Sequence, residues 1–106
     1  MVNVKSVDFV VSGNKNNINT FIKNVSPFLK STNNKQIKLG KNRMRVELEL
    51  GKKQSVLPSQ LQSLLNVYKG LGNVVNEGLV NIDVMELGLE VNNISQFRDN
   101  MMKLSK

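Results

Sequence analysis

The 106-residue sequence contains no cysteine, no histidine and no tryptophan. Without cysteine, the chain can form neither a disulfide framework nor a thiolate metal site. Without histidine, it lacks the commonest general base and the commonest metal ligand in proteins. Its serines therefore have no partner of the usual kind for nucleophilic catalysis. We expect a non-enzymatic protein that uses no cofactor and no metal.

Long hydrophobic runs are also missing. No apolar stretch approaches the ~20 residues that a membrane-spanning helix needs. The first residues, MVNVKSVDFVV, lack the charged start and unbroken apolar core of a signal peptide. We therefore expect a soluble, cytoplasmic protein with no membrane attachment. The length fits one domain, residues 1–106.

Positive charge is concentrated in the first half of the chain. Residues 1–53 carry eleven bases and three acids, or +8, whereas residues 54–106 carry four bases and five acids, or −1. Together they make the net charge of +7. Such an asymmetric field indicates a polyanionic partner. A compositional alternative is AT-rich coding, because lysine outnumbers arginine twelve to three and asparagine is frequent.

Hydrophobic periodicity predicts seven elements in the order β-α-β-β-α-β-α. Period-two patterns predict strands at residues 2–11, in two segments of 35–50, and at 79–91. Helical patterns run through 18–25, 57–71 and onward from residue 92. The first helix either stops near Val25 or continues for a turn at Pro27 that buries Phe28 and Leu29.

This order predicts an α+β fold, a βαββαβ ferredoxin-like sandwich with an extra C-terminal helix. The sheet would have four antiparallel strands and two helices on one face. The alternative is another small antiparallel sheet with helices, in which residues 79–91 form a loop and a helix. The last helix, with Met101 and Met102, would either fill the core or, if it does not cover the sheet, form a homodimer contact.

Residues 35–50 give the strongest structural pattern, a β-hairpin that turns at Gly40-Lys41-Asn42. Its alternation predicts that Lys38, Arg43 and Arg45 share one sheet face, opposite the core. Glu47 and Glu49 continue the same face and partly neutralise it. The seven candidate binding residues on and beside this hairpin are Lys35, Lys38, Lys41, Arg43, Arg45, Lys52 and Lys53.

A basic two-stranded ribbon fits a DNA major groove, and its cations can neutralise backbone phosphates. We therefore hypothesise a small basic nucleic-acid-binding accessory or regulatory protein, of phage or mobile-element type, with DNA or RNA as partner. The third predicted strand, residues 43–50, has no aromatic side chain, so the base-stacking platform of RNA-recognition domains is missing. The turn Ser12-Gly13-Asn14-Lys15 is a weaker phosphate-binding candidate, because it precedes a predicted helix.

Two alternatives to nucleic-acid binding remain open. The chain could be a protein-interaction module or inhibitor, again of phage or mobile-element type, whose basic face binds an acidic protein surface. The lysines could instead be an ordinary solvated surface that deters edge-to-edge aggregation.

Overall fold

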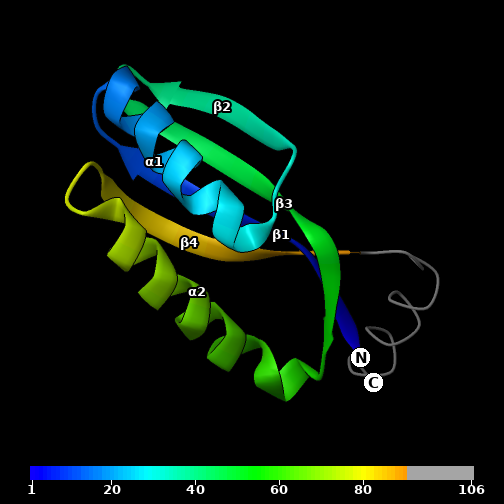
Figure 1. Cartoon of the computed structure of the whole chain (residues 1–106). Coiled ribbons are helices and arrows are strands. Elements are labelled where there is room, and N and C mark those ends of the chain that lie inside the picture. The colour runs from blue at the N-terminus through cyan, green and yellow to red at the C-terminus, as the bar shows by residue number, and fades with distance from the viewer. Residues whose placement is uncertain (91–106) are drawn as a thin grey trace, which may run out of the picture.

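The computed structural model describes residues 1–90 (Figure 1). The helix expected from residue 92 onward lies outside the described residues. Along the described chain the elements are β1 (Val2–Ser12), α1 (Lys15–Leu29), β2 (Asn34–Gly40), β3 (Arg43–Val56), the 3-10 turn η1 (Pro58–Gln60), α2 (Leu61–Asn76) and β4 (Asn81–Leu89).

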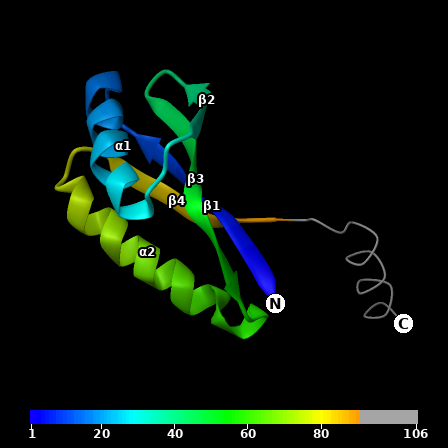
Figure 2. The same ribbon diagram turned by 45° about the vertical axis from the view of Figure 1, so that its right-hand side comes forward.

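The four strands form one antiparallel sheet in the order β2-β3-β1-β4. Both helices cover the same face of this sheet, and Figure 2 shows the other face uncovered by any helix of residues 1–90. We call this second surface the open face. The predicted α+β class, with four antiparallel strands and two helices, is confirmed. Within residues 1–90, neither helix combines the length and the apolar character that crossing a bilayer requires.

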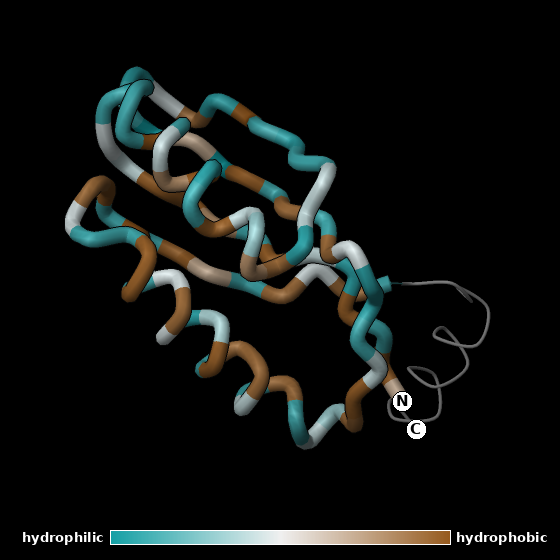
Figure 3. Tube along the Cα trace, viewed as in Figure 1, coloured by the Kyte–Doolittle hydropathy of each residue, from teal (hydrophilic) through white to brown (hydrophobic). Residues whose placement is uncertain are grey.

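The hydrophobic core lies between the sheet and the two helices. Its centre is an edge-to-face contact of Phe9 in β1 with Phe21 in α1, whose ring centroids are 5.4 Å apart. In the coloured trace of Figure 3, apolar residues alternate with polar ones along the strands. The predicted helical stripe is buried, as are alternate residues of the central strands: Val7, Val11, Ile18, Ile22, Val25, Val46 and Leu48.

Helix α1 passes through Pro27 and ends at Leu29, so it does not stop near Val25. Leu29 is buried because it continues the apolar stripe four residues after Val25. Phe28 is 60% exposed, and the prediction that it is buried is wrong. Adjacent helical positions point about 100° apart, so one turn cannot bury both residues against the same surface. Lys30 then closes the helix in the left-handed conformation, with φ 51°.

Strand β3 is longer than the sequence pattern predicts. Gly51 reads as the start of a turn, but the strand continues to Val56. The pairing with β1 shifts between Ser6↔Glu49 and Val4↔Gln54, so the intervening residues of β3 form an irregular bulge. Here a Cβ on Gly51 would overlap the Lys30 carbonyl oxygen. The glycine is needed because β3 passes close to the end of α1.

The helical pattern predicted at residues 57–71 corresponds to η1, which begins at Pro58, and to α2, which continues beyond Gly70 and Gly72 to Asn76. The end comes at Glu77, which has φ 49°. Gly72 instead allows close packing of α2 on the sheet, because a Cβ there would lie 2.9 Å from Met85 Cε.

Two glycine substitutions test these assignments. We expect Gly51→Ala to lower the free energy of unfolding by about 1–3 kcal/mol, because its methyl group overlaps a backbone carbonyl. Gly70→Ala is the matched control: nothing lies within 4 Å of its Cβ, and alanine should stabilise α2 by about 0.5–1 kcal/mol. Urea unfolding measures both changes. Equal effects of the two substitutions would contradict the close approach at Gly51.

Candidate nucleic-acid interface

The basic residues of the hairpin do not share one face of the sheet. Ile37 of β2 is paired with Arg45 of β3, and Lys38 is paired with Met44. Directly paired residues point to the same face. Lys38 therefore lies on the side of Met44, opposite Arg43 and Arg45, and the prediction that all three share a face is wrong. The pairing of β2 with β3 differs by one residue from the pairing that the prediction requires, and a difference of one residue moves every side chain of β2 to the opposite face.

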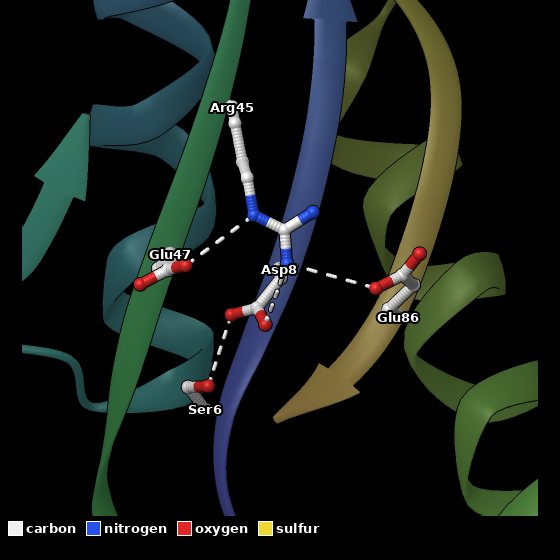
Figure 4. Close-up of polar contacts among 5 residues, drawn as sticks. All are labelled: Ser6, Asp8, Arg45, Glu47 and Glu86. Atoms are coloured by element: carbon white, nitrogen blue, oxygen red, sulfur yellow. Dashed lines mark hydrogen bonds and ion pairs between the residues drawn. The ribbon is translucent and has the colours of Figure 1, made fainter. Parts of the chain in front are cut away.

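Arg45 lies at the centre of a polar network on the open face (Figure 4). Its Nη2 atom is 3.4 Å from Asp8 Oδ2 and 3.6 Å from Glu86 Oε2. Its Nε atom donates to Glu47 Oε1 at 3.3 Å. Ser6 Oγ donates to the other oxygen of Asp8, at 2.9 Å. Three carboxylates from three strands thus surround one guanidinium group, which makes Arg45 a poor phosphate ligand.

Asp8 is the buried member of this network and is 7% exposed. Burial is the main reason that its pKa is raised above the usual 3.8, and the negative charges of Glu47 and Glu86 act in the same direction. The hydrogen bond from Ser6 and the charge of Arg45 oppose this increase. The Arg45 pKa is raised, chiefly by its hydrogen bond with Glu47.

Arg43 lies at one end of the open face and is only partly neutralised. Its Nε atom is 3.4 Å from Asp83 Oδ2, and its side chain is 54% exposed. Ser12 Oγ donates to the same Asp83 oxygen at 2.6 Å. Around the open face, carboxylates of the described residues outnumber cations. The acids are Asp8, Glu47, Glu49, Asp83 and Glu86, and the bases are Lys5, Lys35, Arg43 and Arg45.

A basic pocket lies at one end of the sheet, between the start of α1 and the β2–β3 turn. It has a volume of about 170 Å³ and is lined by Lys15, Lys38, Lys41 and Arg43. No carboxylate of residues 1–90 lines it. The Gly13 N–H donates to the Asn42 carbonyl at 2.8 Å and connects the two segments. We call these four cations the basic end.

The other predicted residues lie elsewhere. Lys52 and Lys53 are nine or ten residues further along β3 than Arg43, about 30 Å away at the rise of an extended strand. Lys53 Nζ pairs with Glu90 Oε1 at 2.5 Å. Lys35 lines a separate pocket of about 320 Å³ together with Glu47 and Glu49.

Lys15 is the functional candidate that the hairpin hypothesis omits. Its signal in the sequence is the turn Ser12-Gly13-Asn14 before α1, where the Asn14 side chain accepts from the Asn17 N–H at 2.8 Å. This capping interaction fixes the start of the helix. Only the tertiary structure brings Lys15 beside the hairpin turn.

No group of three or more carboxylates in the described part of the chain is arranged to hold a metal ion. Comparisons of the chain with protein-family models, with curated proteins and with solved structures gave no match. The features that bear on function are therefore the charges and contacts of the open face and the basic end.

Asp8→Asn tests the burial of this carboxyl through the pH dependence of stability. Because the pKa of Asp8 is raised above 3.8, the folded state holds its proton more tightly than the unfolded chain. The wild-type free energy of unfolding should therefore decrease as pH rises from about 3.8 through the raised pKa. Asp8→Asn has no carboxyl group at this position and should not show this decrease. As pH rises across that interval, the free energy of unfolding of the variant should therefore increase relative to that of wild type.

Urea unfolding of both proteins between about pH 3 and pH 7 measures this difference. Glu49→Gln, which removes an exposed carboxylate from the same face, controls for the change in net charge. If the free energy of unfolding changed with pH in the same way in wild type and in Asp8→Asn, the raised pKa of the buried Asp8 carboxyl would be contradicted.

Proposed function

We propose that this chain is a small, non-enzymatic accessory or regulatory protein that binds nucleic acid, with its basic end on the phosphate backbone. One observation carries the proposal: four cations from two separate segments line a single pocket that no described carboxylate lines. Each phosphate that such cations neutralise releases counterions, which favours binding at low salt.

The charge distribution also supports a particular binding mode. Arg45 and its three carboxylate partners make the broad face of the hairpin an unsuitable surface for DNA or RNA. The end of the hairpin, with Lys41 in its turn, is the better candidate for contact with phosphates. Contacts of this kind position a protein on nucleic acid without reading its sequence. We therefore infer little sequence preference.

We further infer a ferredoxin-like arrangement, which the element order βαββαβ, the strand order β2-β3-β1-β4 and the two helices on one face support. A nucleic-acid ligand implies work in the cytoplasm. The lysine- and asparagine-rich composition supports an origin in an AT-rich phage or mobile element.

The second candidate function is an interaction module or inhibitor that binds an acidic protein surface through the same cations. The observation that favours a protein partner is the exposed apolar surface of α2. Val67 and Val74 lie two turns apart and are 65% and 72% exposed. Nucleic-acid binding gives these side chains no role, whereas apolar surface of this kind is common at protein interfaces.

Paired lysine substitutions test the role of the basic end. We expect Lys38→Ala combined with Lys41→Ala to reduce the slope of log K against log salt by about 1.5–2 units, because two phosphate contacts are lost. Lys52→Ala with Lys53→Ala is the matched control, since it removes the same charge about 30 Å away. The control should change the slope by less than half as much.

Fluorescence anisotropy with labelled single-stranded DNA, duplex DNA and an RNA hairpin, at about 50 and 150 mM salt, provides the measurement. Absence of binding to all three at the lower salt concentration would end the proposal. Equal losses in the two double variants would place the contact outside the basic end. Tighter binding to a polyglutamate peptide of matched charge would favour the acidic protein partner.

A further inference from the structure

A trough runs along β4, on the side of the sheet that α2 covers. One part, of about 270 Å³, is lined by Leu61 and Leu65 of α2 and by β4 residues up to Leu89. The other, of about 330 Å³, is lined by Lys69 and Asn73 of α2 and by β4 residues 82–85. Met85 lines both parts, which follow one another along β4, and we refer to the two together as the trough.

The part of the trough beside Leu61 and Leu65 exists because α2 packs tightly on the sheet only from Tyr68 onward. Its buried residues are Tyr68, Gly72 and Val75. Leu61 and Leu65, in the first half, are only partly buried. Figures 1 and 2 show α2 running alongside β4. Apolar surface of α2 and β4 therefore remains partly exposed along the trough, where no further strand of residues 1–90 covers it.

β4 is also an edge strand. It pairs with β1 on one side, and no strand of residues 1–90 pairs with its other side. The backbone of such an edge can accept an additional extended strand, whose main-chain hydrogen bonds supply affinity. Side chains that alternate along the added strand would then meet two different surfaces.

Those two surfaces differ in chemistry. Towards α2, the part of the trough beside the start of the helix is lined by Leu61, Leu65 and Leu87, and the part further along the helix by Lys69 and Asn73. Towards the open face, Asp83 and Glu86 are the only charged side chains of β4. They pair with Arg43 and Arg45, but the further carboxylates on Arg45 leave this side with an excess of negative charge. The opposite edge of the sheet, β2, carries two lysines and no acid. A basic segment would therefore be attracted to β4 and repelled by β2.

We propose that the trough binds an extended segment of a partner protein in which aliphatic residues alternate with Lys or Arg, added as a fifth strand beside β4. The aliphatic side chains pack against Leu61, Leu65 and Leu87. The basic side chains lie beside Asp83 and Glu86. The site does not depend on the proposed binding of nucleic acid, and the ion pair of Asp83 with Arg43 connects it to the basic end.

The probe is a capped seven-residue peptide of alternating Lys and Val, titrated into the isotope-labelled full chain and followed by NMR. We expect saturable shifts in β4 and in the leucines of the trough, and slower hydrogen exchange at alternate β4 amides. Two control peptides should bind at least about tenfold more weakly. One has Glu in place of Lys, and the other is a Lys-Val peptide whose amides along one backbone edge are N-methylated.

Matched variants localise the charge effect. Glu86→Gln should weaken the Lys-Val peptide about two- to fivefold, in keeping with the loss of one exposed ion pair. Glu49→Gln removes the same charge from β3, outside the trough, and should leave binding unchanged.

Four results would each overturn the proposal: absence of saturable shifts, equal binding of the Glu-Val peptide, shifts centred on β2, or equal effects of the two variants. Slow exchange at the outward-facing β4 amides before peptide is added would also overturn it. That result would mean that the chain itself, or a second copy of it, already covers the edge.

Discussion

The hydrogen bonding of β1 on both of its sides is the constraint on which the rest of this structure depends. β1 pairs with β3 and with β4 along most of its length. Its alternation places Phe9 under α1, against Phe21, and Asp8 on the open face, against Arg45. One strand thus supplies both the centre of the core and the buried anion of the polar network.

The pairing register also determines which cations remain available to a ligand. Glu47 and Asp8 are direct partners across the β1–β3 pair, as are Glu86 and Asp8 across the β1–β4 pair. Three carboxylates are therefore brought around Arg45. Exposed ion pairs contribute only about 0–1 kcal/mol each, so their main effect here is on the field that a ligand meets. Neutralisation of the open face leaves the basic end as a concave surface lined by four cations and by no carboxylate of residues 1–90.

The two proposed binding surfaces have different physical bases. The basic end depends on Coulomb attraction and counterion release, so binding there should weaken steeply with salt. The trough beside β4 combines an unpaired strand edge with half-buried leucines, and its two acids select a basic segment. The two surfaces lie mainly on different elements: β4 and α2 for the trough, and α1 with the β2–β3 turn for the basic end, with the Asp83–Arg43 ion pair between them.

Local pattern in the sequence determined the kinds of element, their order and most of the core. The alternation in β1 and the stripe of Ile18, Phe21 and Ile22 suffice, because side-chain direction within a strand or helix follows from its own period. The tertiary structure decided the rest. Whether Ile37 or Lys38 points to the open face depends on the register with β3, and Gly51 is a close contact with α1 instead of a turn. Lys15 joins Lys41 only because β1 ends beside the hairpin turn. These outcomes depend on contacts between residues far apart in the chain, which local periodicity does not encode.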